Sequence, residues 1–147
     1  MTGLAFRIDT ASPEEIRRHL SACDDRFIPP LSPRVAIPAY AEKLRAHAMT
    51  VEAWDGARLV GLVAIYWNDI RGYITNVSVE AGWAGRGVGS ALLAEVVTQA
   101  RRRGVASIEL EVGAGSEPAL RLYRSAGFVA TGEAGGAAGM IRLAWRA

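Results

Sequence analysis

The chain has 147 residues, half of them hydrophobic and 22% charged, which is typical of one globular domain and not of a disordered chain. Its formal net charge is +2, and the basic run at residues 101–103 ends an expected helix, so we expect no nucleic-acid partner. No apolar stretch is long enough to span a membrane, the N-terminal residues do not resemble a signal peptide, and Cys23 is the only cysteine, so we expect a cytoplasmic protein without a metal site.

The N-terminal half predicts two helices and four strands. A short strand over residues 5–9 is followed by Ser12-Pro13, a typical helix start, and then by an irregular segment at residues 27–38 that carries four prolines. Pro38 is expected to open the second helix. Strands are predicted over residues 50–54, 59–67 and 73–79, with turns at residues 55–56 and 68–72.

The C-terminal half alternates helices and strands. Apolar residues at helical spacing predict a helix over residues 88–104, and strict alternation predicts a half-buried strand over residues 107–112. A helix over residues 118–126 and two closing strands over residues 128–133 and 140–145 complete the chain. This order predicts a single domain over residues 1–147, of mixed α/β (α+β) class.

A glycine-rich turn links the strand over residues 73–79 to the helix that begins at residue 88. Glycines at positions 85, 87 and 89 let successive backbone N–H groups approach an anion, and the helix N-terminus adds partial positive charge. A dinucleotide fingerprint would need a glycine at Ser90 or Leu92, and a P-loop would need a Gly-Lys pair, whereas Lys43 is the only lysine. The turn therefore predicts a phosphate site of another kind.

The turn resembles the pyrophosphate-binding motif of the GNAT superfamily of N-acetyltransferases, Arg/Gln-x-x-Gly-x-Gly/Ala. Downstream, Leu122-Tyr123 and Gly127-Phe128 resemble the second signature of that family. Two departures stand out: Ala84 replaces the usual Arg or Gln, and Ser116 replaces the usual Asn. The resemblance implies a mixed, mostly antiparallel central sheet with helices on both faces, and acetyl-CoA as co-substrate. It also implies a set of cofactor-binding residues: Val77, Ser78, Val79, Gly85, Arg86, Gly87, Val88, Gly89, Ser90 and Ser116.

Direct acetyl transfer to an amine needs a base for the ammonium, donors for the oxyanion and stabilisation of the departing thiolate. The resemblance implies that Tyr123 stabilises or protonates the thiolate, and exposed N–H groups of the strand at residues 73–79 are expected to serve the oxyanion. That strand lacks the glutamate that the family often uses as base. The candidates that remain are water and the carboxylates of Asp69, Glu80, Glu109 and Glu111.

The acceptor is expected to bind between the first two helices and their connection, near residues 24–27 and Tyr40. The leading hypothesis is a small-molecule primary amine. The alternatives are a protein N-terminus or lysine, and a non-catalytic acyl-CoA-binding module. A homodimer is compatible with this sequence.

Overall fold

The structure is a computed structural model, which describes residues 3–27, 30–134 and 139–147. Seven strands form one sheet in the order β1-β2-β3-β4-β5-β7-β6. The strands are β1 (Leu4–Ile8), β2 (Met49–Asp55), β3 (Arg58–Trp67), β4 (Arg71–Val79), β5 (Ser107–Gly113), β6 (Val129–Ala134) and β7 (Met140–Arg146). All neighbouring strands are antiparallel except β4 and β5, which are parallel.

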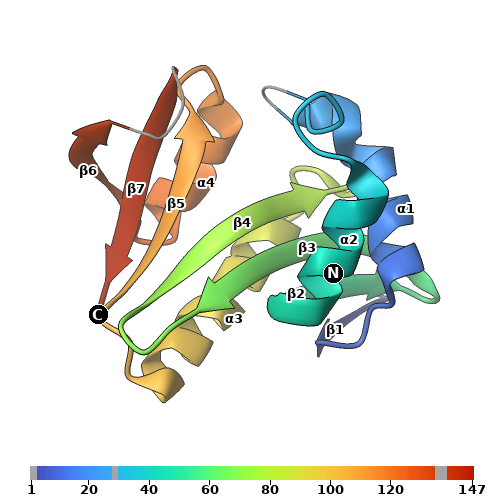
Figure 1. Ribbon diagram of the computed structural model, residues 1–147, viewed down its shortest axis with the longest axis horizontal. Coiled ribbons are helices and arrows are strands. Elements are labelled where there is room, and N and C mark those ends of the chain that lie inside the picture. Colours follow the sequence, from blue (N-terminus) through green and yellow to red (C-terminus); the bar gives the residue numbers. More distant parts are fainter. Residues whose placement is uncertain (1–2, 28–29, 135–138) are drawn as a thin grey trace.

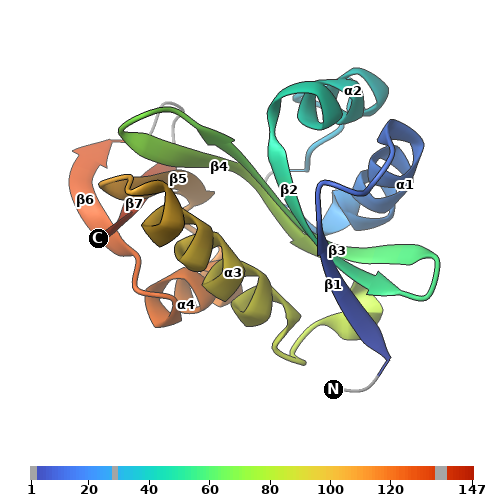
Figure 2. The same cartoon turned by 90° about the horizontal axis from the view of Figure 1, so that it is seen from below.

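Four α-helices cover the two faces of this sheet (Figures 1 and 2). Two helices, α1 (Pro13–Cys23) and α2 (Ile37–His47), pack on one face, and α3 (Val88–Arg103) and α4 (Glu117–Ser125) pack on the other. Short 3₁₀ turns at η1 (Asp24–Arg26) and η2 (Ala81–Trp83) were not predicted. The expected mixed, mostly antiparallel sheet with helices on both faces is confirmed. Among the described residues, no helix is both long and apolar enough to cross a membrane.

The two apolar clusters show how the sequence directs the helices to opposite faces. Leu92, Leu93 and Val96 of α3 recur at helical spacing and are fully buried against the β-branched residues of the sheet. On the other face, Ile16 and Leu20 of α1 are fully buried together with residues of α2. Ser12 caps α1 in a reciprocal capping box with Glu15, as its position before Pro13 predicted.

A buried carboxylate joins the start of α1 to the sheet. The Glu52 side chain, fully buried on β2, accepts hydrogen bonds from the N–H groups of Thr10 and Ala11, both at 3.0 Å. It also accepts from the hydroxyl groups of Thr10 and Thr50 and, at 3.0 Å, from Nε1 of Trp54. Five donors converge on this one carboxylate, which is how its burial is compensated.

Replacing Glu52 with glutamine is expected to lower the free energy of unfolding by about 3 kcal/mol. The substitution removes the charge and turns an amide N–H₂ group toward groups that are themselves donors. Urea denaturation followed by circular dichroism measures the change, with the exposed Glu42 replaced by glutamine as the control. Equal stability of the two variants would contradict the role assigned to Glu52.

Candidate active site

The sheet opens between β4 and β5. These strands pair only where Arg71–Tyr73 meets Ser107–Glu109, and their C-terminal halves then diverge (Figure 1). Beyond Tyr73, therefore, the β4 edge that faces β5 has no partner strand. An unpaired strand edge presents backbone N–H and C=O groups to whatever occupies the opening.

A β-bulge in β4 reverses the side-chain directions at this opening. Ile74 pairs with Ile65 and Asn76 with Ala64, so Thr75 has no partner on β3. Ile74 is buried in the cluster beneath α3, and after the bulge Ser78 faces α1 instead. Without the extra residue, the period of two would direct Ile74, Asn76 and Ser78 to the same face.

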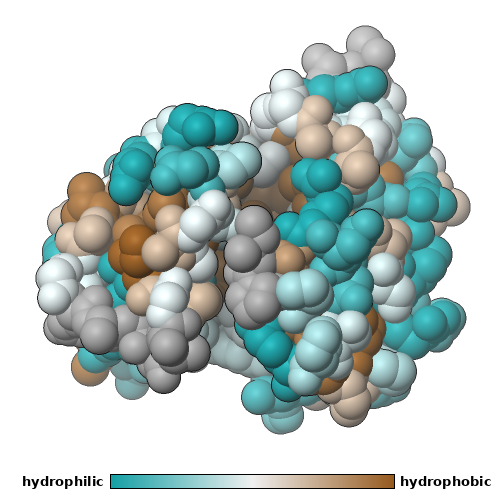
Figure 3. Space-filling view, turned by 90° about the horizontal axis from the view of Figure 1, so that it is seen from above, coloured by the Kyte–Doolittle hydropathy of each residue, from teal (hydrophilic) through white to brown (hydrophobic). Residues whose placement is uncertain are grey.

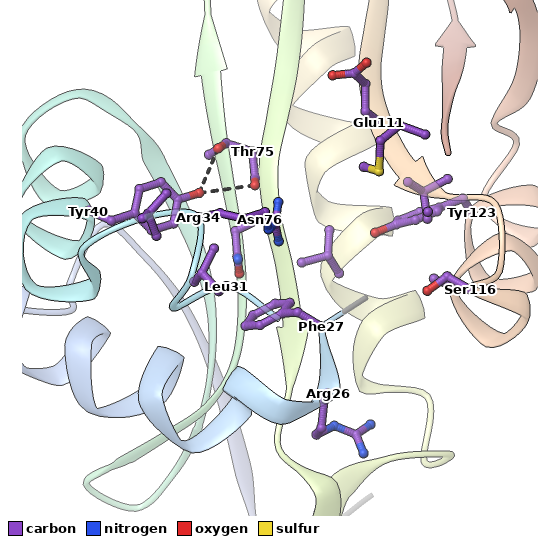
Figure 4. Close-up of a pocket in the computed structure, with 16 residues that line it drawn as sticks. Arg26, Phe27, Leu31, Arg34, Tyr40, Thr75, Asn76, Glu111, Ser116 and Tyr123 are labelled. Atoms are coloured by element: carbon purple, nitrogen blue, oxygen red, sulfur yellow. Dashed lines mark hydrogen bonds between the residues drawn. The ribbon is translucent and has the colours of Figure 1, made fainter. Parts of the chain in front are cut away.

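Tyr40 of α2 contacts this bulge from the face of the sheet that α1 and α2 cover. Its hydroxyl donates to the Thr75 carbonyl at 3.2 Å and lies 2.7 Å from the Thr75 hydroxyl (Figure 4). Burial raises the pKa of Tyr40 to about 12, although the hydrogen bond with Thr75 opposes this shift. Tyr40 is therefore a fixed donor at neutral pH.

A cavity of 260 Å³ occupies the opening, and its walls come from segments distant in the sequence. Figure 3 shows the surface hollowed between the side formed by β5–β7 and α4 and the side formed by α1 and α2. The lining residues are Arg26, Phe27, Leu31, Arg34, Val35 and Tyr40 from the α1–α2 side, Thr75, Asn76, Val77, Glu111, Val112 and Gly113 from the sheet, and Ser116, Ala119, Tyr123 and Met140.

Tyr123 presents its hydroxyl to this cavity (Figure 4). The residue is only 8% exposed, and its ring packs edge-on against Phe128 with centroids 6.0 Å apart. Burial raises the pKa of Tyr123, so the hydroxyl keeps its proton at neutral pH. Ser116, the N-cap residue of α4, lines the same cavity and makes no side-chain capping bond.

The carboxylates predicted as bases are in four different environments. Only Glu111 is among the residues that line the cavity, where Tyr73 donates to it at 3.5 Å and Arg142 lies 3.9 Å away. Glu109, two residues earlier, forms an ion pair with Arg71 at 3.1 Å. Asp69 is exposed in the turn between β3 and β4.

Glu80 lies at the end of β4 in a cluster of cations. It accepts from Nε of Arg58 at 3.1 Å, and Arg18 lies 3.7 Å away. Burial raises its pKa, but the Arg58 hydrogen bond and the charges of Arg58 and Arg18 together leave the pKa of Glu80 below its usual value. Glu80 does not line the cavity.

The glycine-rich turn has two kinds of glycine. Gly85 and Gly87 have φ angles of +74° and +81°, and a Cβ at either would meet nothing within 4 Å, so the backbone conformation is what requires them. At Gly89, a Cβ would lie 3.0 Å from Cδ2 of Leu122. This glycine therefore allows α3 to approach α4, the helix that carries Ser116 and Tyr123.

The N-terminus of α3 has no side-chain cap, in contrast to that of α1. The first intrahelical bond runs from Ala91 N–H to the Gly87 carbonyl, so the N–H groups of residues 88–90 precede any intrahelical acceptor. The helix begins at Val88, whose side chain is buried in the core, and Ser90 is in its first turn. This N-terminus is suited to an anion.

The cations near this turn contact other groups. The Arg86 guanidinium lies over the Trp83 ring, 5.1 Å from its centroid. Arg26 of η1, which lines the cavity, donates to the carbonyl of Val79 at 3.1 Å. Ala84 stands at the position where the family usually has Arg or Gln, so residue 84 contributes no polar side chain to the turn.

Two of the residues predicted for cofactor binding, Val77 and Ser116, line the cavity together with Tyr123, whereas Ser78 does not. The Ser78 hydroxyl lies 2.8 Å from Nε2 of His19 and 2.8 Å from the side-chain amide of Asn76. His19 was not among the residues predicted for the site. Its ring is fully buried and hydrogen-bonded to Ser78 of β4. This contact depends on the bulge, which leaves no pattern in the sequence.

Burial lowers the pKa of His19 to about 4, which the nearby Glu80 charge only partly offsets. The folded protein therefore holds His19 neutral, and the unfolded chain binds more protons between pH 6.5 and 4. Stability from this residue is fully present above pH 6.5 and is lost as the pH falls to about 4.

Acidification from pH 6.5 to pH 4 is expected to remove about 3 kcal/mol of stability through His19. Urea denaturation at several pH values measures this loss. Replacing His19 with glutamine, which does not titrate, is expected to flatten the dependence by that amount, and an unchanged slope would show that another group is responsible.

Comparison with known proteins assigns this architecture to a family. Residues 14–128 match the family model described as acetyltransferase (GNAT) family. The chain is 37% identical over 103 residues to the uncharacterized N-acetyltransferase YsnE of Bacillus subtilis, covering 67% of this chain and 68% of that protein. It is 40% identical over 53 residues to the [ribosomal protein bS18]-alanine N-acetyltransferase of Escherichia coli, covering 36% of each.

A solved structure has the same fold. The GNAT family acetyltransferase from Elizabethkingia anophelis with acetyl-CoA bound superposes with a TM-score of 0.72 at 18% identity, covering 100% of both chains. The family match spans more than half of the chain, and it includes the glycine-rich turn and Tyr123, which lines the cavity. This chain belongs to the acetyltransferase (GNAT) family and is an acyltransferase.

Proposed function

We propose that this protein transfers the acetyl group of acetyl-CoA directly to a primary amine on a small molecule. The observation that carries the proposal is the cavity between β4 and β5, into which the protonated Tyr123 presents its hydroxyl and which Glu111 lines from β5. Direct transfer needs a donor near the sulfur and an acceptor near the amine.

The opening fits acetyl-CoA at three points. The uncapped N-terminus of α3 and the turn at residues 85–90 suit the pyrophosphate. The unpaired β4 edge at Val77 to Val79 can pair with the amide groups of the pantetheine arm, as a strand edge pairs with an extended peptide. The thioester then enters the cavity near Tyr123. In support, the Elizabethkingia structure with the same fold holds acetyl-CoA.

The reaction follows from these groups. Glu111, directly or through water, takes a proton from the acceptor ammonium, and the amine nitrogen then bonds to the thioester carbon. Backbone N–H groups of the unpaired β4 edge stabilise the oxyanion as charge moves to the carbonyl oxygen. The carbon–sulfur bond breaks, and the Tyr123 hydroxyl gives its proton to the departing thiolate. The nitrogen of the product still carries the extra proton, which it returns to the tyrosinate directly or through water. The products are the N-acetylated amine and free CoA thiol.

A second candidate acceptor is the N-terminal amine of a protein. It is favoured by the 40% identity over 53 residues to the bS18-alanine N-acetyltransferase. The small molecule is preferred because the cavity volume of 260 Å³ lies just below the usual range of small-ligand pockets, and because Phe27, Leu31 and Tyr40 line it on the side of α1 and α2.

The test is CoA-thiol release from acetyl-CoA in the presence of panels of amines, amino sugars, amino acids and peptides, with the product identified by mass spectrometry. Acetylation of a small amine supports the proposal, whereas acetylation of peptides alone favours the second candidate. If the protein binds acetyl-CoA in calorimetry but acetylates neither panel, the proposed transfer is wrong and the alternative of a non-catalytic acyl-CoA-binding module gains support.

A further inference from the structure

A series of hydrogen-bonded, buried polar groups leads from the cavity to the buried face of α1. His19 is fully buried, and Ser78 and Asn76 are each 6% exposed. Nδ1 of His19 lies 3.2 Å from the Leu59 carbonyl, Nε2 lies 2.8 Å from Oγ of Ser78, and that hydroxyl lies 2.8 Å from the Asn76 amide. Of these residues, only Asn76 lines the cavity.

The protons available to these hydrogen bonds are limited in number. The Leu59 carbonyl can only accept, and it also accepts from Arg18 at 2.7 Å. Nδ1 of His19, 3.2 Å from the same oxygen, makes this contact a hydrogen bond only when it carries a proton. If Ser78 donates to Oδ1 of Asn76, then Nε2 of His19 must also carry a proton, to donate to the Ser78 oxygen. With Oδ1 of Asn76 turned to Ser78, all three hydrogen bonds are therefore made only by a doubly protonated His19.

Burial opposes that cation. The nearest charges are those of Glu80 and Arg18, which act in opposite directions, and the Cys23 thiol lies 3.8 Å from Nε2. Burial is the largest influence, and at neutral pH it leaves the imidazole with a single proton. A single proton, held on Nδ1 by Leu59, makes Nε2 an acceptor for the Ser78 hydroxyl.

The Asn76 amide can satisfy this arrangement by rotating. The two ends of an amide have nearly the same size, so a half-turn exchanges Oδ1 and Nδ2 without displacing a neighbour. Nδ2 then donates to Ser78, Ser78 donates to His19, and His19 donates to Leu59. Every buried group keeps a partner, and Oδ1 of Asn76 is released toward the cavity.

We propose that His19 is a positioning residue that acts through Ser78 to hold the Asn76 amide with its oxygen toward the cavity, where it accepts an N–H of the acceptor amine. This inference rests on the proposed acetyl transfer. Asn76 follows the bulge and so faces the acceptor side of β4, together with Tyr40. An acceptor amine that donates one N–H to this oxygen keeps its nitrogen lone pair directed at the thioester carbon.

The first experiment measures the protonation state directly. A two-dimensional ¹H–¹⁵N spectrum of the histidine side chains at pH 7 is expected to show His19 neutral, with the proton on Nδ1. His47, exposed at the end of α2, is the internal reference, and the His19→Gln variant assigns the signals. A doubly protonated ring or a proton on Nε2 alone would overturn the proposal, whether or not any amine is acetylated.

The second experiment measures kinetics with an amine that the wild-type protein acetylates. The Ser78→Ala substitution breaks the chain between His19 and Asn76 and is expected to raise KM for the amine by about tenfold. KM for acetyl-CoA is expected to stay within about twofold, since the contact assigned to residue 78 is with its backbone, which alanine keeps. Ser21→Ala, on the exposed side of α1, is the matched control.

Two substitutions at His19 separate positioning from packing. Glutamine can donate to Leu59 and accept from Ser78, so His19→Gln is expected to keep KM for the amine within about threefold of wild type. His19→Leu can do neither and is expected to raise it as Ser78→Ala does. Equal KM values for the leucine variant and the wild type, or a parallel rise in KM for acetyl-CoA, would overturn the proposal. Failure of the wild type to acetylate any amine would instead contradict the proposed function.

Discussion

Replacing Tyr123 with phenylalanine is expected to lower kcat by about 100-fold or more. The substitution removes one hydroxyl that faces the cavity and leaves the ring packed edge-on against Phe128. Without this donor, the departing thiolate develops its charge in a partly desolvated space with no proton nearby. Steady-state CoA release at saturating acetyl-CoA and amine measures the effect.

Affinity for acetyl-CoA is expected to change little in this variant, because the pyrophosphate and pantetheine contacts assigned above lie at the turn and on β4. Calorimetric titration with acetyl-CoA checks this point. Tyr66→Phe is the matched control: the Tyr66 hydroxyl is buried, has no hydrogen-bond partner in the described part of the chain, and does not line the cavity. If kcat were the same for Tyr123→Phe and wild type, Tyr123 would have only a packing role.

Replacing Glu111 with glutamine is expected to lower kcat/KM for the amine by about 100-fold at pH 7. A primary ammonium has a pKa near 10.4, so almost all of the acceptor arrives protonated and must lose a proton at the carboxylate. The free amine becomes about tenfold more abundant with each pH unit, so the deficit is expected to shrink steadily toward pH 10.

The profile of kcat/KM against pH, measured from pH 6 to 10 for wild type and variant, tests this dependence. Glu109→Gln is the matched control, since Glu109 lies on the same face of β5, is paired with Arg71 at 3.1 Å and does not line the cavity. A loss confined to the Glu109 variant would move the base to that residue. Small losses in both variants would favour water as the base.

The order of the elements could be predicted from the sequence because each depends on local chemistry. The Ser12-Pro13 start of α1, the helical spacing of Leu92 and Val96, and the alternation along β5 are signals that a short window contains. Glycines at residues 85 and 87 were predicted from the same kind of pattern, and their positive φ angles agree with it. The family followed from two such motifs in the right order.

The tertiary structure decided which polar residues share the cavity. Four carboxylates were equivalent in the sequence, and only the divergence of β4 from β5 separates Glu111, which lines the cavity, from Glu109, which pairs with Arg71. The bulge at Thr75 likewise turns Asn76 and Ser78 toward α1 and joins them to His19. A bulge and a strand divergence arise from contacts between segments far apart in the chain, and a local pattern contains neither. The sequence by itself determined the order of elements and the turn suited to phosphate, and the long-range packing of α1, α2 and the sheet determined the groups that face the acceptor.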